Sequence, residues 1–321
     1  MPQTAAGVTG RVFELEADAA YRRWRDWKLA RRARDADALT VEVADPRALS
    51  AAEREALLAR IAASNMALYR SPIRHEDKRL PRALGAQLGL HRLDANWLAD
   101  EDGISSIAVS DRSDAGGRGG FIPYTDRAIR WHTDGYYHPQ QRRIHAMILH
   151  CVRPAQRGGG NALLDHELAY IALRDASPDH IRALMQPDAM TIPAREDEGG
   201  VARAAQSGPV FSIDAQDRLH MRYTARTRSI EWKDDAATRA AVACLEALLA
   251  GDSPSIVRLR LDAGMGFVGH NVLHERSAFV DDPAHPRLLY RARFLDRIAN
   301  PKDDPDNDTP AQAAAASWRN G

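Results

Sequence analysis

The sequence has few features of a secreted or membrane protein. It contains two Cys in 321 residues, Cys151 and Cys244, so neither a disulfide framework nor a thiolate metal cluster is expected. Its apolar runs are too short for a transmembrane helix. The first ten residues lack the basic-then-apolar order of a signal peptide. These absences predict a soluble, cytoplasmic protein without a membrane partner.

Charge of one sign is also missing. The 44 basic residues, of which four are Lys and 40 are Arg, are balanced by 44 acidic residues. A net charge of zero argues against general nucleic-acid binding, which needs a basic surface to displace counterions. Hydrophobic residues make up 44% of the chain, enough for a sizeable core. The chain also has twelve His, and imidazole is both a common metal ligand and a base near neutral pH.

The N-terminal segment, about residues 12–36, is predicted to form a helix. Its apolar residues recur at steps of three and four and make one stripe: Phe13, Ala17, Ala20, Trp24 and Trp27. We interpret the Arg-rich remainder as a solvated surface around this stripe, in preference to a membrane-surface, nucleic-acid or partner-binding helix. The stripe could dock on the rest of its own chain or on another subunit, which leaves a homo-oligomer open.

The rest of the chain indicates one domain with strands at its centre and helices outside. Helices are expected to begin at Ser50, where Glu53 completes a capping box, at Asp165 and at Ser177, and another is expected over 234–249. Residues 300–321 are rich in Pro, Asp and Ala and are expected to form a mobile tail. Strands are predicted at 66–70, 144–152, 256–261, 267–272 and 288–295, with a hairpin of 210–213 and 219–223.

The sharpest local feature is the tripeptide His132-Thr133-Asp134. In an extended segment, residues two apart face the same side, so His132 and Asp134 could offer a nitrogen and a carboxylate to one ion. A single His-x-Asp is weak evidence unless a distant His completes it. Two His and one carboxylate occupy one face of an octahedral metal and suit non-haem Fe(II) oxygenases. The C-terminal candidates are His270, His274 and His285, of which we take the first and last as ordinary loop histidines.

Arg287 lies 13 residues after His274, enough for a strand, a turn and a return on the neighbouring strand. A guanidinium placed there could bind a dicarboxylate bidentately near the metal. Three glycines, 158–160, follow a predicted strand, but no Gly-Lys-Ser/Thr follows them, so a tight turn is favoured over a phosphate loop.

Taken together, these pieces resemble the Fe(II)/2-oxoglutarate-dependent dioxygenases of the taurine dioxygenase (TauD/TfdA) type, which include γ-butyrobetaine hydroxylase. The similarity extends over about residues 65–297. Its pieces are Tyr124-Thr125 before His132-Thr133-Asp134, Leu149-His150-Cys151, Gly158-Gly159-Gly160-Asn161, Val272-Leu273-His274-Glu275-Arg276-Ser277-Ala278-Phe279, and Arg287-x-x-x-Arg291-Ala292. The strand around His274 resembles the butyrobetaine branch, and the two arginines resemble the taurine branch. Glu275 stands where the family usually has Gly.

The resemblance implies an α+β fold with a double-stranded β-helix (jelly-roll) core flanked by helices, in a single domain. The expected boundaries are an N-terminal helical extension at 1–40, the dioxygenase domain at 41–298 and a tail at 299–321. It implies Fe(II), 2-oxoglutarate and O2 as cofactor and cosubstrates. The reaction implied is hydroxylation of a small, polar or anionic metabolite with release of succinate and CO2. Retention of Asp134 favours hydroxylation over halogenation.

The resemblance also assigns residues. The iron ligands would be His132, Asp134 and His274. Arg287 would bind the distal carboxylate of 2-oxoglutarate, and Asn161 stands where the family often has a Thr that bonds the same group. Candidate substrate contacts, each with an ordinary structural role as its alternative, are Arg291, Tyr137 and Arg222. The competing function is a zinc-binding β-barrel protein, hydrolytic or non-catalytic, with the same three ligands.

Overall fold

Two sheets form the centre of the protein in the computed structural model, which describes residues 12–94, 100, 102–110, 121–197, 200–226 and 230–299. The larger sheet has the strand order β1-β2-β16-β5-β19-β3. Its neighbours are antiparallel except for β1 and β2. Its strands are β1 (Thr40–Glu42), β2 (Met66–Arg70), β3 (Ser105–Ile107), β5 (Ala146–Arg153), β16 (Met265–His270) and β19 (Leu288–Phe294).

The smaller sheet is antiparallel throughout and has the order β15-β7-β17-β4. The two sheets pack face to face, because side chains of both meet in one buried cluster that includes Met147 and Phe267 from the larger sheet and Leu163 and Val257 from the smaller. Burial of this apolar surface is the main contribution that holds the sheets together. The strands of the smaller sheet are β4 (Ile129–His132), β7 (Asn161–Leu164), β15 (Ile256–Leu259) and β17 (Leu273–Arg276).

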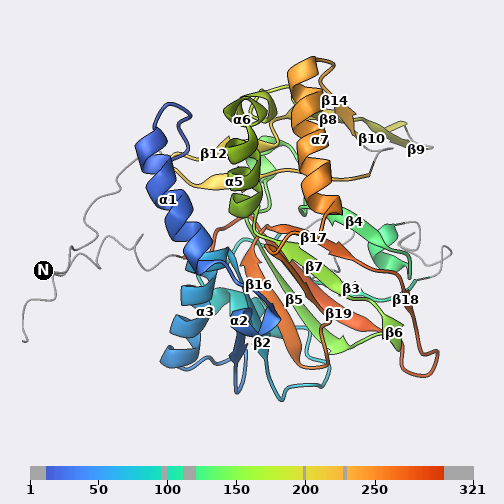
Figure 1. Cartoon of the computed structure of the whole chain (residues 1–321). Helices are drawn as coiled ribbons and strands as arrows, with labels where there is room; N and C mark the ends of the chain where they lie inside the picture. Colours follow the sequence, from blue (N-terminus) through green and yellow to red (C-terminus); the bar gives the residue numbers. More distant parts are fainter. Residues whose placement is uncertain are drawn as a thin grey trace, which may run out of the picture.

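Helices cover the outer faces of this pair of sheets (Figure 1). Helices α3 (Ala51–Ser64) and α4 (Leu80–Gln87) pack on the outer face of the larger sheet, where Leu57 and Leu84 meet Ile148. A second group lies together on one side of the molecule and forms a separate apolar cluster with residues of the smaller sheet. It consists of α1 (Asp18–Arg31), α5 (His166–Ala176), α6 (Pro178–Leu184) and α7 (Ala236–Ala250), with the short α2 (Ala36–Leu39) beside β1.

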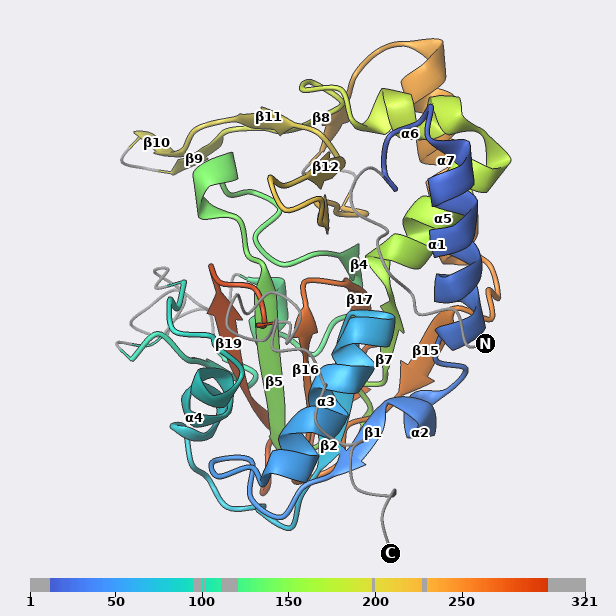
Figure 2. The same cartoon turned by 90° about the vertical axis from the view of Figure 1, so that its left-hand side faces the viewer.

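Short strands form small additional sheets. Several of them lie above β4 and β17 in Figure 2. These are β8 (Met190–Ile192) between β11 (Gln206–Gly208) and β14 (Glu231–Trp232), β9 (Arg195–Asp197) with β10 (Gly200–Arg203), β12 (Phe211–Ile213) with β13 (Leu219–Met221), and β6 (Arg157–Gly158) with β18 (Phe279–Val280). Single turns of 3-10 helix occupy Ile122–Tyr124 and Gln140–Arg142. Within the described residues, every helix is too short or too polar to cross a membrane.

The predicted elements are found close to their expected positions. Ser50 caps α3 and forms the predicted capping box with Glu53, and Asp165 and Ser177 cap α5 and α6. The hairpin of β12 and β13 and the strands at 66–70, 144–152, 256–261, 267–272 and 288–295 are confirmed within a few residues. The turn at glycines 158–160 is confirmed too, because Gly158 and Gly159 have positive φ angles of 76° and 69°. Of the predicted tail, residues 300–321 lie outside the described residues.

The prediction for the first helix is wrong in its bounds and in part of its buried surface. The helix begins at Asp18, so Phe13 and Ala17 precede it. Trp27, placed in the apolar stripe, is 41% exposed, whereas Lys28, placed among the solvated residues, is fully buried. The Lys28 ammonium lies 2.7 Å from Asp165 and 2.5 Å from Glu167, which explains how a charge can occupy this interior position.

Further contacts hold the N-terminal segment against α5. Arg174 donates hydrogen bonds to the main-chain carbonyls of Val12, Glu14 and Leu15. The Tyr21 hydroxyl donates to Asp175 at 2.8 Å. The helix therefore contributes side chains to the interior of the same body as the two sheets.

Candidate metal centre

His132 and His274 occupy directly opposed positions on neighbouring antiparallel strands. His132 is the last residue of β4 and pairs in register with His274 of β17. Side chains of opposed residues project from the same face of a sheet. The two imidazole rings consequently lie with their centroids 4.2 Å apart and their planes at 49°.

A main-chain carbonyl holds each of these rings in the same way. Nδ1 of His132 lies 2.9 Å from the Arg130 carbonyl, and Nδ1 of His274 lies 2.9 Å from the Val272 carbonyl. A carbonyl oxygen can only accept, so Nδ1 carries the hydrogen in each neutral ring. The lone pair on Nε2 of each ring is therefore available to a metal, and the hydrogen bond fixes the orientation of the ligand.

Asp134 completes the group just beyond the end of β4. One of its carboxylate oxygens, Oδ1, lies 3.9 Å from Nε2 of His132, and the other, Oδ2, is buried without a hydrogen-bond partner. Ligand atoms of His132, Asp134 and His274 all lie within 4.8 Å of one another. A buried carboxylate oxygen without a partner is costly unless a cation or water satisfies it. The predicted ligands thus meet at one point, with donor atoms suited to a divalent metal.

The electrostatic surroundings favour the protonation states that a metal needs. Burial, with a contribution from His274, lowers the pKa of His132 to about 3. Burial also lowers the pKa of His274. Burial raises the pKa of Asp134, but the charges of Arg291 and Arg293 outweigh it, so that this pKa lies below its ordinary value. At neutral pH the site holds two neutral imidazoles and one carboxylate.

Arg287 immediately precedes β19 and is buried, with 5% of its surface exposed. Its guanidinium lies 5.0 Å from the ring centroid of Phe279, and its Nη1 has no hydrogen-bond partner. Asn161 and Arg287 line one small cavity, and Asn161 and His274 line a second, largely apolar one. Asn161 therefore lies between the metal centre and Arg287. Its amide donates a hydrogen bond of 3.3 Å to the Glu275 carbonyl.

The predicted substrate residues differ in what they contact. Arg291 donates a hydrogen bond of 3.3 Å to Oδ1 of Asp134, and its own Nε is buried without a partner. The Tyr137 hydroxyl accepts a hydrogen bond of 3.1 Å from Arg293, and the Arg203 guanidinium lies 5.8 Å from the Tyr137 ring centroid. Arg291 thus touches the metal centre, and Tyr137 is linked to it through Arg293, whose charge acts on Asp134.

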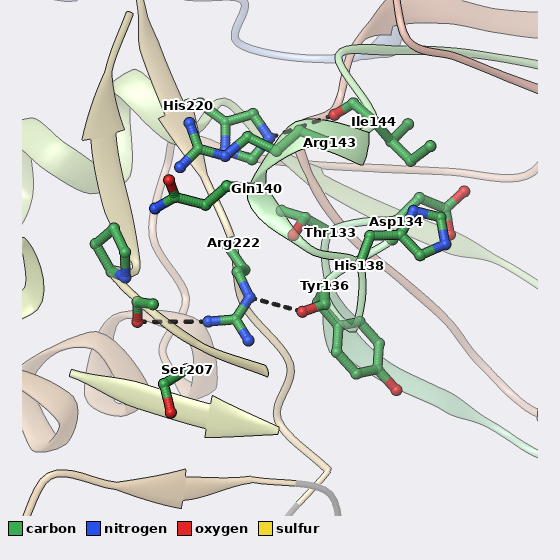
Figure 3. Close-up of a pocket in the computed structure, with 13 residues that line it drawn as sticks. Thr133, Asp134, Tyr136, His138, Gln140, Arg143, Ile144, Ser207, His220 and Arg222 are labelled. Carbon is green, nitrogen blue, oxygen red and sulfur yellow. Dashed lines mark hydrogen bonds between the residues drawn. The ribbon is translucent and has the colours of Figure 1, made fainter. Parts of the chain in front are cut away.

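Arg222 is turned instead to the main chain. Its guanidinium donates to four carbonyl oxygens, at 2.7 Å from Tyr136, 3.0 Å from Met190, 3.4 Å from Gly208 and 2.6 Å from Gln206. Figure 3 shows it spanning the space between the segment after Asp134 and β11. This geometry ties two segments together, and the contact of Arg222 with substrate stays a prediction.

A pocket adjoins the segment after Asp134 and is lined by cationic and polar side chains (Figure 3). Besides Arg222, its lining includes Arg143 and His220, and Nδ1 of His220 is buried without a partner. Such a lining suits a polar or anionic group better than an apolar one.

Sequence reasoning missed two residues of the site. Arg293 could have been found, because residues two apart on a strand share a face and Arg293 lies two residues after Arg291 on β19. Asn271 could not: it lies between β16 and β17 and contacts the main chain of Asp134, and no periodicity indicates this.

Comparison with known proteins agrees with this geometry. Residues 30–293 match the family described as "Taurine catabolism dioxygenase TauD, TfdA family". The chain is 33% identical over 177 residues to a uridine-5'-phosphate dioxygenase of Amycolatopsis sp, a match that covers 52% of this chain and 60% of the relative. It is also 33% identical over 202 residues to a uridine-5'-phosphate dioxygenase of Streptomyces sp, which covers 60% of this chain and 70% of that one.

Solved structures show the same fold at lower identity. An asparagine oxygenase in complex with Fe(II), 2S,3S-3-hydroxyasparagine and succinate is 17% identical, with a TM-score of 0.56 and 84% of each chain covered. The non-heme iron oxygenase OrfP in complex with Fe, succinate and (3S)-hydroxy-L-Arg is also 17% identical, with a TM-score of 0.56 and coverage of 77% of this chain and 81% of OrfP.

Proposed function

The chain belongs to the TauD, TfdA family of taurine catabolism dioxygenases, and we propose that it is an Fe(II)- and 2-oxoglutarate-dependent dioxygenase that hydroxylates a small polar or anionic metabolite, releasing succinate and CO2. The observation that carries this proposal is the convergence of His132, Asp134 and His274 on one point with both Nε2 atoms available. Fe(II) bound there would supply the activation of O2 that couples decarboxylation of 2-oxoglutarate to substrate oxidation.

His132, Asp134 and His274 would hold the iron through two imidazole nitrogens and one carboxylate, a ligand set that suits Fe(II) oxygenases. The Nδ1 hydrogen bonds keep the two imidazoles oriented, and the charge of Arg291 keeps Asp134 ionised. The cavity beside His274 is lined mainly by apolar side chains, which limit the access of water to the bound cosubstrate: Leu68, Met147, Leu149, Leu163, Leu259, Leu261 and Phe267.

Arg287 is the residue that we assign to the distal carboxylate of 2-oxoglutarate. Its guanidinium is buried, and its Nη1 donors have no protein acceptor, so a carboxylate would satisfy a cation that is otherwise costly to bury. The Asn161 amide, which lines the same cavity, would donate a second hydrogen bond to that carboxylate. This pair supports a dicarboxylate cosubstrate.

The substrate end of the site is rich in guanidinium groups and tyrosine. Arg291, with an unpartnered Nε next to Asp134, is the group that we assign to an anionic part of the substrate, and Tyr137 would line the same space. Because two relatives at 33% identity are named uridine-5'-phosphate dioxygenases, nucleoside 5'-phosphates are the first substrates to test. Membership in the butyrobetaine branch remains a prediction from the strand around His274.

We also infer that the two sheets are the walls of a double-stranded β-helix. The order β16-β5-β19-β3 in one sheet faces β15-β7-β17-β4 in the other. The chain crosses between the sheets from β3 to β4 to β5, and again from β15 to β16 to β17 to β19, which is how such a core is wound.

The zinc-protein alternative finds no support in the comparisons. A hydrolytic zinc site needs three ligands and a water but no carboxylate clamp. In a zinc protein, the buried Arg287 and the cavity that it lines with Asn161 would have no function.

A panel assay tests the function. The protein is incubated with Fe(II), ascorbate and 2-oxoglutarate in air, with nucleoside 5'-phosphates, amino acids and sulfonates as separate substrates, and succinate is measured. We expect at least one anionic compound to raise succinate formation and to gain one oxygen atom by mass spectrometry. Succinate no higher than in the His132→Ala variant with every compound would contradict the proposal.

A further inference from the structure

Asn271 lies in the two-residue connection between β16 and β17, with 4% of its surface exposed. Its side-chain oxygen accepts a hydrogen bond of 2.8 Å from the main-chain N–H of Asp134. Its side-chain nitrogen donates to the carbonyl of Asp134 at 2.8 Å and to that of Ile144 at 3.0 Å. The amide thus uses its two hydrogens and its oxygen on main-chain groups of the segment that follows β4.

These bonds matter because Asp134 lies where strand pairing has ended. The last pairing of this segment joins Thr133 to Tyr223, through the Thr133 N–H to the Tyr223 carbonyl and the Tyr223 N–H to the Thr133 hydroxyl. Gly135, with a φ of 67°, then turns the chain. Among the described residues, the main-chain N–H and C=O of Asp134 bond to Asn271. One side chain therefore sets the direction in which the Asp134 carboxylate leaves the main chain.

Asn271 is itself held firmly. Its main-chain N–H donates to the His145 carbonyl at 3.2 Å. The preceding His270 is bound through its main-chain N–H and its Nδ1 to Asn65, at 2.8 Å each. His274 follows three residues after Asn271. The same segment therefore carries one metal ligand, His274, and holds the main chain of a second, Asp134.

We propose that Asn271 is a positioning residue for the metal centre: its amide holds the Asp134 main chain so that the carboxylate meets the Nε2 atoms of His132 and His274. This inference rests on the proposed function, because it gives Asn271 a task in binding the iron. Loss of residues that orient metal ligands commonly weakens metal binding about 10- to 100-fold. We expect a loss of that order when the amide hydrogens are removed.

The test compares Asn271→Asp with Asn271→Ala in the full-length protein. Asp has nearly the same shape as Asn and can still accept from the Asp134 N–H, but it offers no hydrogen to the two carbonyls. Anaerobic titration with Fe(II) in the presence of 2-oxoglutarate gives the metal affinity and the visible charge-transfer band. Both variants should bind Fe(II) about 10- to 100-fold more weakly and show a displaced or weakened band.

Asn65→Gly is the matched control. Asn65 also has a buried side-chain amide, and it contacts His270 at the end of β16. It does not contact Asp134. Its φ of 58° suits glycine, so the change removes the side chain without backbone strain. The variant keeps the main-chain bond from the His270 N–H to the Asn65 carbonyl, which anchors this segment, so it should lose stability and keep the Fe(II) affinity of wild type. Equal loss of affinity in Asn65→Gly, or wild-type affinity in Asn271→Asp, would overturn the proposal.

A measurement on wild type covers the case in which the Asn271 variants do not fold. Hydrogen exchange of the Asp134 amide in the metal-free protein should be slow, because Asn271 accepts its hydrogen in the interior. Rapid exchange of this amide would overturn the proposal. Absence of any charge-transfer band in folded wild type would count instead against the iron-dependent function.

Discussion

His132 and His274 lie directly opposite each other on β4 and β17, and each ring donates its Nδ1 hydrogen to the carbonyl two residues before it. Both Nε2 atoms are thereby directed to the same side, where the Asp134 carboxylate lies within 4.8 Å. The antiparallel register thus brings the two imidazoles side by side, and the local hydrogen bonds fix the tautomer with the hydrogen on Nδ1.

Burial of neutral histidines makes the stability of the metal-free protein depend on pH. Burial lowers the pKa of His132 from 6.5 to about 3 and the pKa values of His145 and His150 to about 4. Between these values and 6.5 the unfolded chain binds more protons than the folded one, so stability falls as pH falls from 6.5 towards 4.

We expect the free energy of unfolding in urea to fall by up to about 1.4 kcal/mol per pH unit for each such site. In His132→Gln, the free energy of unfolding should change by about 1.4 kcal/mol less per pH unit than in wild type. The control is the same substitution at an exposed position, His91→Gln, which should leave the dependence unchanged. The same pH dependence in wild type and His132→Gln would contradict this expectation.

Replacement of Arg287 should act on 2-oxoglutarate. Arg287→Lys keeps the positive charge but loses the planar fork that binds a carboxylate through two bonds. A hydrogen bond to a charged group contributes about 1.5–3 kcal/mol, so the KM for 2-oxoglutarate should rise about 10- to 100-fold. Steady-state succinate formation at varied 2-oxoglutarate measures it. Arg258→Lys, on the exposed side of β15, should not change KM. An unchanged KM in Arg287→Lys would refute the assignment.

Removal of the Lys28 charge should destabilise the protein strongly. Lys28→Met leaves Asp165 and Glu167 buried without their cation, and such a loss costs about 3–5 kcal/mol. Urea unfolding of the metal-free protein measures it. The control is Arg22→Met on the same helix, where the side chain is 74% exposed and the expected change is within about 0.5 kcal/mol. Equal stability of Lys28→Met and Arg22→Met would contradict the claim that the buried ion pairs of Lys28 hold α1 in place.

Much of the fold could be predicted because its signals are local. The capping box of Ser50 and Glu53 and the helix cap at Asp165 depend on residues within one turn, and the strand at 144–152 is an uninterrupted apolar run. The prediction for the first helix was wrong at Lys28 because a buried lysine requires partners from elsewhere. Asp165 and Glu167 are far away in sequence, and nothing in residues 12–36 indicates them.

The candidate site divides in the same way. His132 and Asp134 were identified by their spacing, and His274 by resemblance, but their convergence depends on the register between β4 and β17. For Arg222, the sequence gives the charge but not its partners. Only the fold shows that its guanidinium donates to four main-chain carbonyls. Asn271 acts through the main chain of Asp134, a contact that residue type alone does not predict.

The most direct test of the metal centre is anaerobic addition of Fe(II) and 2-oxoglutarate to the metal-free protein, followed by visible absorption. His132, Asp134 and His274 should hold the iron with 2-oxoglutarate chelated beside Arg287 and give a weak charge-transfer band in wild type that is absent in His132→Ala. No band in folded wild-type protein, or the same band in His132→Ala, would contradict the assignment of this site.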